Sequence, residues 1–349
     1  MFLAWKEIIH EKKHFALITI MITLIGVLVF FLTGLAIGLQ SAMSQGVTNL
    51  KAENILLSQD SNQNIQASLI PEDTLNDVKT FKSAPLGFGA LTLNHNGQQT
   101  SATVFAINPT DFTAPTITKG RMFNAPCEII VDDSLIRKGY QLNDIIYAPQ
   151  HDEPFTIVGF THHATYATAP IVYMSIPDWQ DTGIQYQGTI SAIATTENIS
   201  TTTLAHTKLS SQTLPEFIKS IPGVTAQNLT FGMMISALVL VSAVILGIFI
   251  YVLTLQKKHL FGVMKTQGVS NSVIGWSVIW QTLILAVTGS TVAGLLVVII
   301  GLALPEAVPF TIPWLLFTAV GAMMVFFSLL GALFSVRTAT AIDPLLALK

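Results

Sequence analysis

Two histidines near the amino terminus have the spacing of a zinc protease. The segment His10-Glu11-Lys12-Lys13-His14 matches H-E-x-x-H, in which two histidines one helical turn apart bind zinc and the glutamate acts as a base. The match is formal, because no third ligand is evident and the two lysines would oppose the charge of a metal. We interpret the segment as a solvated interfacial helix and expect no intrinsic metal. The zinc content of the purified protein would test this.

The other residues of chemical interest do not form an enzyme site either. His162 and His163 fit a pair at the end of a strand better than a metal site. No G-x-x-x-x-G-K-[ST] segment occurs, so we expect no ATP binding through a P-loop and no catalytic residues. Any energy from ATP must then come through another subunit.

The composition is typical of a membrane protein. Of 349 residues, 51% are hydrophobic and 11% are charged, against about 25% charged in soluble chains. The apolar residues gather in runs without internal charge, and about 20 such residues cross a bilayer as a helix. The apolar core of a signal peptide has about 7–15 residues, and the first run is longer, so we expect it to be retained as a helix in the mature protein. We predict transmembrane helices at 15–44, 229–255, 273–304 and 312–336.

Basic residues flank these runs asymmetrically, and this predicts the orientation. By the positive-inside rule, both termini and the 256–272 loop are cytoplasmic, and residues 45–228 are extracellular. The outer segment holds 9 Lys and Arg against 16 Asp and Glu, and the whole chain has a net charge of −3, so no nucleic-acid partner is expected. The basic residues that decide the orientation are Lys6, Lys12, Lys13, Lys257, Lys258, Lys265, Arg337 and Lys349.

The 45–228 segment has the composition of a mixed α/β domain. Its one cysteine, Cys127, is the only one in the chain, so no intramolecular disulfide can support the domain. We predict that 194–213, rich in Thr and Ser, is a loop or a weak helix. Strands are predicted at 145–148, 155–161 and 171–176, and helices at 71–81, 132–138 (ended by Gly139) and 214–221.

The first helix carries a stripe of small residues, each four positions apart: Gly34, Gly38, Ala42 and Gly46. Such a stripe lets two helix backbones approach closely. It fits a dimer or gating face, and it fits equally well packing against another helix of the same chain.

Apolar and methionine residues gather where the first and second helices meet the outer face. Adaptable methionines beside aromatic rings suit a flat apolar ligand, although core packing or lipid contact explains such stripes more often. The residues of this candidate substrate site are Leu39, Gln40, Met43, Glu53, Phe231, Met233 and Met234.

The loop between the second and third helices is short, basic and amphipathic. A helix of this kind can lie on a membrane surface or insert into a groove of a soluble partner. Its candidate docking residues are Lys257, Lys258, Phe261, Gly262, Met264, Lys265 and Gly268.

This loop and the tail resemble a known family. The loop, 257–270, is similar to the "basic, x-x, E-I-G-I-L-R-A-L-G-A-S" segment of MacB/FtsX-type ABC transporter permeases, although Leu260-Phe261 stands where the family often has Glu-Ile. The tail, 337–348, resembles the family's "R-A-x-x-x-D-P-x-x-A-L" ending, and 120–159 resembles its extracytoplasmic domain. The resemblance implies an α-helical membrane protein with four transmembrane helices and an inserted α/β extracytoplasmic domain, the MacB-like periplasmic core domain.

The resemblance also implies partners and a mechanism. Such permeases are homodimers or pairs of homologues joined to two copies of a cytoplasmic ABC ATPase, which binds the ATP. Residues 1–14 then form an amphipathic elbow helix, 256–272 the coupling helix, and 337–349 a cytoplasmic tail in a multi-pass plasma-membrane protein.

The opening residues, 1–8, look like those of the family's haem-exporter permeases. On that reading the substrate is haem, there is no intrinsic cofactor, and haem enters laterally from the membrane between the first two helices. Met43 and Glu53 would be the contacts to the haem iron. The alternatives are another cargo (a lipoprotein, a peptide antibiotic or a lipid) and an FtsX-like transmitter that activates an extracellular protein and carries nothing.

Overall fold

The fold was obtained as a computed structural model that describes residues 7, 9–78, 82–149, 151–197, 199, 204, 207–305 and 308–340, without the side chains of 258–260, 334, 335 and 337–340. The chain divides into two compact units. One contains residues 1–38 and 227–349 and is called the four-helix unit here; the other, 39–226, is called the inserted domain. Residues 1–6 and 8 of the expected elbow, the side chain of Lys258 and the tail from 341 lie outside the described residues.

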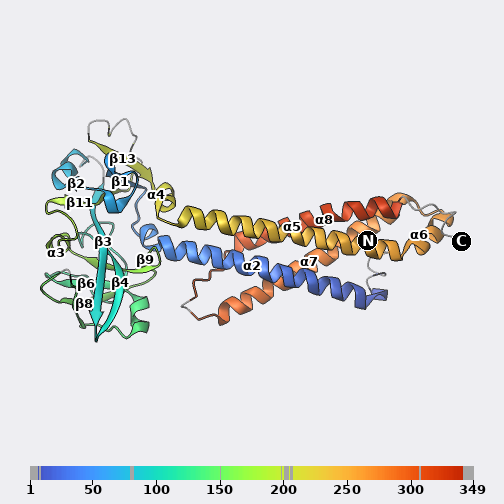
Figure 1. The fold of residues 1–349 in the computed structure, drawn as a ribbon, viewed down its shortest axis with the longest axis horizontal. Helices are drawn as coiled ribbons and strands as arrows, with labels where there is room; N and C mark the ends of the chain where they lie inside the picture. Colours follow the sequence, from blue (N-terminus) through green and yellow to red (C-terminus); the bar gives the residue numbers. More distant parts are fainter. Residues whose placement is uncertain are drawn as a thin grey trace. The chain divides into compact units, whose positions relative to one another are not determined.

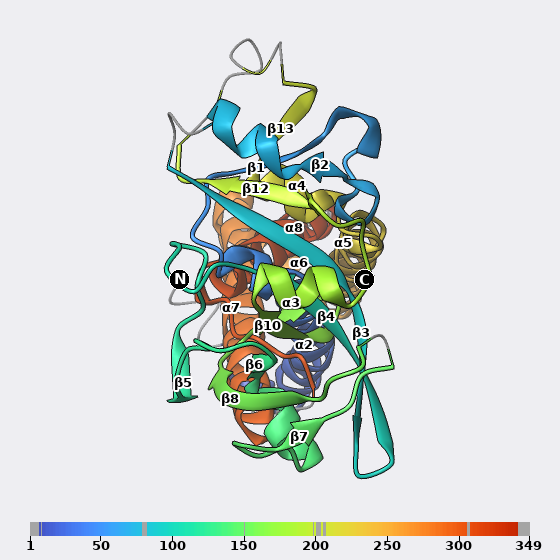
Figure 2. The same ribbon diagram turned by 90° about the vertical axis from the view of Figure 1, so that its left-hand side faces the viewer.

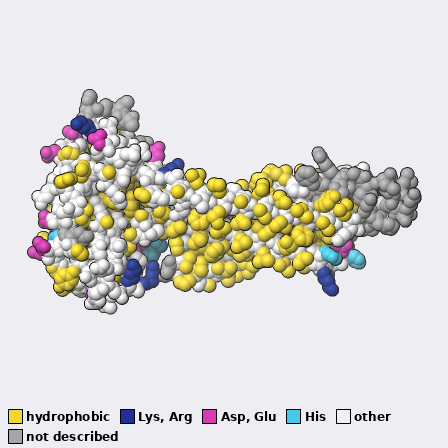
Figure 3. Space-filling model, viewed as in Figure 1, with side chains coloured by type: hydrophobic (Ala, Val, Ile, Leu, Met, Phe, Trp, Pro, Cys, Tyr) yellow, Lys and Arg dark blue, Asp and Glu magenta, His cyan; other side chains and the backbone are white. Residues whose placement is uncertain are grey.

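Long apolar helices build the four-helix unit (Figure 1). In the described chain, four helices are long and apolar enough to cross a membrane, with mean hydropathies of 2.2 to 2.9 over their most apolar windows. Hydrophobic side chains cover the face of this unit seen in Figure 3, and Leu302 and Leu315 are 77% and 86% exposed. Such a surface is stable only in lipid or against another apolar partner. The helices are α2 (Lys12–Thr48), α5 (Val224–Gln256), α7 (Asn271–Ala303) and α8 (Trp314–Thr340).

Glycines set the close contacts between these helices. A Cβ at Gly26 of α2 would lie 2.7 Å from that of Ala293 in α7. A Cβ at Gly331 of α8 would lie 2.6 Å from the carbonyl oxygen of Ala243 in α5. In lipid the hydrophobic effect gives helices little reason to associate, so close backbone packing at small residues matters more.

The inserted domain is built on a mixed sheet (Figure 2). Its strand order is β13-β1-β12-β3-β4-β10-β6-β8-β5, with β7 beside β8, β9 beside β10, and β11 paired separately with β2. The strands are β1 (Asn54–Ser58), β2 (Ile70–Pro71), β3 (Ser83–His95), β4 (Gln98–Ala106), β5 (Ile117–Gly120), β6 (Glu128–Asp132), β7 (Ile145–Ile146), β8 (Phe155–Thr161), β9 (Thr165–Tyr166), β10 (Ala169–Met174), β11 (Thr189–Ile190), β12 (Ala192–Thr195) and β13 (Leu209–Thr213). Short helices join them: η1 (Gln59–Ser61), η2 (Ile65–Ala67), η3 (Glu72–Val78), η4 (Asp133–Lys138), α3 (Ile176–Asp181) and α4 (Leu214–Ser220).

Buried side chains fill the inserted domain without a disulfide. One cluster contains Phe105, Tyr166 and Tyr173, and a second contains Trp179 and Phe155. These large side chains supply the apolar burial that a domain of this size needs to fold without covalent links.

The expected fold class, with four apolar helices and an inserted mixed domain, is confirmed. The strand at 155–161 is confirmed as β8. The helix expected at 132–138 is a 3-10 helix, Asp133–Lys138, ended by Gly139 at φ 91°, and α4 covers the expected last helix. The helix expected at 71–81 is a 3-10 helix over Glu72–Val78, while Pro71 ends β2 and residues 79–81 lie outside the described residues.

Two further predictions in this domain need correction. The strand expected at 145–148 has only the two residues of β7. The segment 194–213 is not a loop throughout, because its ends form strands: Ala194 pairs with Ile55, and Thr213 with Asn54. Thr and Ser side chains fit a pleated surface, and pairing on both sides of β1 outweighed their preference for turns.

Candidate coupling and substrate sites

A short helix between α5 and α7, α6 (Lys258–Thr266), occupies the predicted coupling segment. Phe261 is only 2% exposed and belongs to the same buried cluster as Phe15, Ile18 and Ile274. Gly262 is buried and Met264 is half-buried against that cluster. The apolar members of the predicted docking set therefore anchor α6 to the rest of the four-helix unit.

The residues at the end of α6 are exposed. Gly268 has φ 87°, and its N–H donates to the carbonyl of Lys265 (3.0 Å), while the N–H of Val269 donates to that of Met264 (3.0 Å). A glycine in the left-handed conformation ends a helix in this way because it has no Cβ to clash. The exposed residues here are Thr266, Gln267, Gly268 and Ser270.

Lys257 lies at the junction of α5 and α6 and is almost fully buried. Its side chain is 8% exposed, and its Nζ lies 3.4 Å from a carboxylate oxygen of Glu11 and 3.6 Å from one of Glu7. The Nζ also lies 5.3 Å from the centre of the Phe15 ring. Gln281 of α7 donates its amide to the same oxygen of Glu7. This cluster (the Lys257 cluster) joins the amino-terminal segment, the α5–α6 junction and α7.

The Lys257 cluster shows that one of the predicted docking residues, Lys257, is not available on the surface. Lys257 points into the unit, and its cationic group is used within the chain. Burial raises the pKa of Glu7, against the opposing effect of Lys257, so this carboxylate depends on the lysine to remain charged. The sequence analysis missed Glu7 and Glu11 as partners. The available signal was the i, i+4 spacing of Glu7 and Glu11, which places both carboxylates on one face of a helix, together with the lysines that follow the second apolar run.

The candidate substrate residues are divided between the two units. In the four-helix unit, Phe231 is half-buried, while Met233 and Met234 of α5 are 74% and 44% exposed. Methionines this exposed contribute little to the core of the unit and are available to an apolar ligand or to lipid.

The remaining candidates belong to the inserted domain. Leu39, Gln40 and Met43 are half-buried, and Met43 packs against the cluster that contains Phe105 and Tyr173. Glu53 is exposed, and its backbone bonds to Thr195 (2.8 Å) and Leu214 (2.9 Å). The seven candidate residues belong to two separate units, so a substrate site that combines them stays a prediction.

The small residues of α2 pack within the chain. A Cβ at Gly34 would overlap the Phe310 ring, and one at Gly38 would overlap the carbonyl oxygen of Pro309. The 309–311 loop, which contains these two residues, is held against α2 by a hydrogen bond from the N–H of Thr311 to the carbonyl of Gly34 (3.2 Å). Gly46, in the inserted domain, meets Ile171 in the same way, and the carbonyl of Ala42 accepts from the N–H of Thr168 (3.3 Å).

No metal centre is found among the described residues, in which no three His, Cys, Asp or Glu side chains gather. His10 and His14 are exposed, and Glu11 is directed to Lys257 rather than to them. His162 contacts the carboxylate of Asp133.

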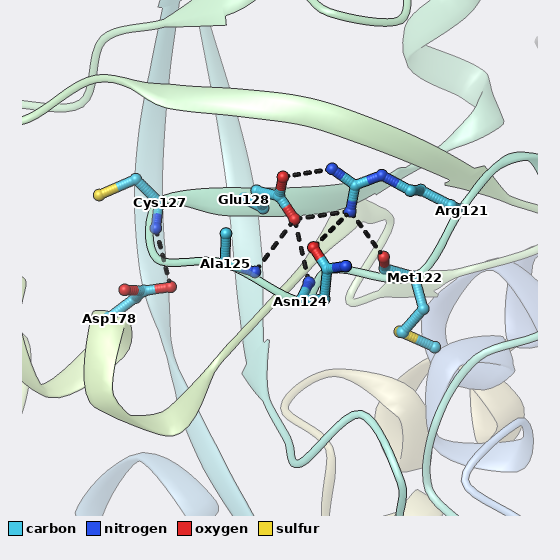
Figure 4. A network of polar contacts seen from close by, with 7 residues as sticks. All are labelled: Arg121, Met122, Asn124, Ala125, Cys127, Glu128 and Asp178. Carbon is cyan, nitrogen blue, oxygen red and sulfur yellow. Dashed lines mark hydrogen bonds and ion pairs between the residues drawn. The ribbon is translucent and has the colours of Figure 1, made fainter.

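Figure 4 shows a network of polar contacts around a turn of the inserted domain. Glu128 accepts hydrogen bonds from the backbone N–H groups of Asn124 (2.9 Å) and Ala125 (3.2 Å), and both of its oxygens meet the Arg121 guanidinium. The Arg121 side chain, followed by these N–H groups, lowers the pKa of Glu128 to about 2. The network fixes the turn before β6 and offers no reactive group.

Four apolar helices, an inserted sheet domain and a short helix anchored between α5 and α7 define a polytopic membrane protein of the transporter-permease type. Residues 232–344 match the family model described as FtsX-like permease C-terminal. Over these residues the chain is similar to FtsX-like permeases, and it is the permease of an ABC-type transporter, a class that lacks an ATPase domain and implies a separate ATPase as partner.

Similar proteins extend along the whole chain. A protein of Staphylococcus epidermidis is 25% identical over 351 residues, which cover 99% of this chain and 98% of the relative. A protein of Staphylococcus haemolyticus is 24% identical over 356 residues, again covering 99% and 98%. Both carry the provisional name hemin transport system permease protein HrtB.

Among solved structures, the extracellular domain of the noncanonic ABC-type transporter YknZ from Gram-positive bacteria matches with 16% identity and a TM-score of 0.33. The match covers 44% of this chain and 88% of that domain. A domain of a permease from Porphyromonas gingivalis matches with 15% identity and a TM-score of 0.27, covering 38% and 73%.

Proposed function

We propose that the protein is the permease of an ATP-driven exporter that removes haem from the membrane. The observation that carries the proposal is the similarity, over 99% of the chain, to relatives named for hemin transport. The permease would act as a homodimer with two copies of a separate ATPase. Both termini and α6 would be cytoplasmic, and residues 45–228 extracellular, as the basic residues predict.

Haem would enter laterally between α2 and α5. A porphyrin is flat and apolar with two carboxylates, so its site needs adaptable apolar side chains and a ligand for the iron. Met233 and Met234 are exposed on α5, and Met43 and Glu53 are the candidate iron contacts. Leu39, Gln40 and Phe231 would complete it.

Force from the ATPase would enter through α6. Because Phe261 and Lys257 anchor this helix inside the four-helix unit, a push on its exposed end would be transmitted to α5, α7 and the amino-terminal segment. The docking surface would consist of the exposed residues 266–268 and 270, together with Lys265.

Haem titration of the purified protein tests the substrate. Binding should shift the Soret absorption, and Met43→Ala, Glu53→Ala and Met234→Ala should each weaken the shift. Met323→Ala is a matched control, because Met323 of α8 is 49% exposed, close to the 44% of Met234. Unchanged spectra in all three site variants would exclude this site, and absence of any Soret shift in the native protein would exclude haem.

A second candidate is an FtsX-like transmitter that acts on an extracellular protein. The inserted domain exposes Tyr147 (61%) and Tyr186 (75%), and exposed tyrosines are common in protein interfaces. A transmitter should lose function after Tyr147→Ser or Tyr186→Ser while its haem spectrum stays unchanged.

A further inference from the structure

The acidic and basic side chains around the H-E-x-x-H segment point in different directions. Glu7 and Glu11 are directed inward to Lys257. The four cationic or titratable neighbours, His10, Lys12, Lys13 and His14, are all exposed. The outward face at the start of α2 is therefore cationic, although the sequence mixes both signs.

An apolar groove begins at this face. It has a volume of about 310 Å³ and is formed between α2 and α7. Ligand pockets typically have volumes of about 300–1,000 Å³, so this groove is a small one. Its lining includes Lys12, Phe15, Thr19, Ile284, Leu285 and Thr288.

The polar atoms inside the groove are already satisfied. The hydroxyl of Thr19 donates to the carbonyl of Phe15 (2.9 Å), and that of Thr288 donates to the carbonyl of Ile284 (2.7 Å). The walls therefore offer methyl and methylene groups to a ligand and demand no hydrogen bond from it. A ligand that fits has a long apolar part.

Lys12 supplies a charge at one end of this apolar groove. Lys12, Ala16 and Thr19 stand at i, i+4 and i+7, which places them on one face of α2. Lys12 is also the first residue of the membrane-spanning helix, where a lysine extends toward the lipid headgroups. The groove thus combines a hydrocarbon slot with a cation at headgroup level.

We propose that this groove binds one anionic phospholipid, with its phosphate at Lys12 and an acyl chain between α2 and α7. Basic pockets between transmembrane helices are suited to anionic headgroups because the charge contact adds to the apolar burial. Such a lipid would contact the amino-terminal segment that the Lys257 cluster ties to α6 and α7.

Native mass spectrometry of the full-length protein in detergent tests the proposal. Phosphatidylglycerol should bind as a single retained molecule and more tightly than phosphatidylcholine. Lys12→Gln should weaken phosphatidylglycerol about fivefold, the effect of about one charge near a membrane surface. Lys13→Gln is the matched control, because Lys13 is also exposed but does not line the groove, and its effect should be under about twofold.

The apolar half of the site has its own test. Thr288→Phe would fill the groove and should abolish retention of phosphatidylglycerol. Thr318→Phe is its control, because Thr318 of α8 is also exposed and also donates its hydroxyl to a carbonyl of its own helix (2.8 Å). Equal binding of phosphatidylcholine, equal losses for Lys12→Gln and Lys13→Gln, retention in Thr288→Phe, or displacement of the lipid by inorganic phosphate would each overturn the proposal.

Discussion

At the scale of single residues, Gly38 is a position where α2 has no room for a side chain. A Cβ there would overlap the carbonyl oxygen of Pro309, whose backbone cannot move aside as a flexible side chain could. We expect Gly38→Val to destabilise the protein by about 1–3 kcal/mol, the usual cost of overpacking, and to lower the thermal unfolding temperature in detergent.

Gly232→Val provides the comparison for this prediction. Gly232 also lies within a long helix, α5, but nothing lies within 4 Å of a Cβ placed there. Both variants share the intrinsic effect of a β-branched residue in a helix, so the difference between them isolates the contact with Pro309. Equal unfolding temperatures would contradict this packing.

Glu128 gives the inserted domain a predictable dependence on pH. Its pKa is lowered from 4.5 to about 2, chiefly by Arg121, so the folded state binds the proton more weakly than the unfolded state. The stabilisation is fully present above about pH 4.5 and is lost as the pH falls from there toward 2. Because the Arg121 side chain is 51% exposed, solvent screening reduces this contribution to stability.

Thermal unfolding of the full-length protein at pH 6 and pH 3 measures this contribution. The native protein should lose more stability between the two values than Glu128→Gln, which has no titrating group at this position. Asp152→Asn, at an exposed carboxylate of the same domain, should keep the native pH dependence. The same loss in Glu128→Gln as in the native protein would show that the network does not stabilise the fold.

Single residues also show the limits of prediction from sequence. The small-residue stripe indicated close packing correctly at Gly34 and Gly38, but not that the partner is the 309–311 loop of the same chain. Lys257 was recognised by its charge and its place in a basic loop. Its burial depends on Glu7, about 250 positions away in the sequence, and a local pattern cannot give a contact of that separation.

At the scale of elements, the Lys257 cluster is the joint between the amino-terminal segment and the α5–α6 junction. Removing one partner of a buried ion pair leaves the other charge unpaired and costs about 3–5 kcal/mol. We expect Lys257→Met to lower the unfolding temperature strongly and to reduce stimulation of the partner ATPase by the permease. Because burial already raises the pKa of Glu7, mildly acidic pH should recover part of the stability by neutralising this carboxylate.

A double-mutant cycle measures the interaction between Lys257 and Glu11 apart from the other contacts of each residue. Lys257→Glu combined with Glu11→Lys should be more stable than the sum of the single changes predicts, because the exchange restores opposite charges at the 3.4 Å contact. Lys13→Ala removes an exposed lysine of the same segment and should change the unfolding temperature little. Strict additivity would mean that the ion pair contributes nothing.

The elements differed in how well the sequence predicted them. The four apolar helices could be located because about 20 uncharged apolar residues have few other stable arrangements. The long hairpin of β3 and β4 was overlooked, although Asn96 and Gly97 at its turn, with φ 50° and 78°, are a strong hairpin signal. The ends of β12 and β13 could not be found locally, since their pairing with β1 joins segments about 140 residues or more apart.

At the scale of the whole molecule, a domain inserted between the first two membrane helices makes those helices its only covalent connections. Any motion produced by an ATPase at α6 can reach the inserted domain through the ends of α2 and α5. The charge distribution predicts that α6 and the inserted domain lie on opposite sides of the membrane, as this route requires.

The single cysteine makes that orientation measurable. Cys127 lies in the inserted domain and is partly exposed, so a membrane-impermeant maleimide added to intact cells should label it. Burial, followed by the bond to Glu153, raises the pKa of its thiol to about 11. Because the thiolate is the reactive form, labelling should become about tenfold faster from pH 7.5 to pH 8.5.

A second cysteine variant tests the cytoplasmic side of the membrane. In Cys127→Ser, a cysteine placed at the exposed Gln267 after α6 should be labelled only after the cells are permeabilised. Cys127→Ser alone should remain unlabelled in both conditions, because the chain has no other cysteine. If Gln267→Cys were labelled in intact cells and Cys127 only after permeabilisation, the orientation would be reversed. An ATPase at α6 would then have no access to ATP in the cytoplasm, and the proposed coupling could not operate.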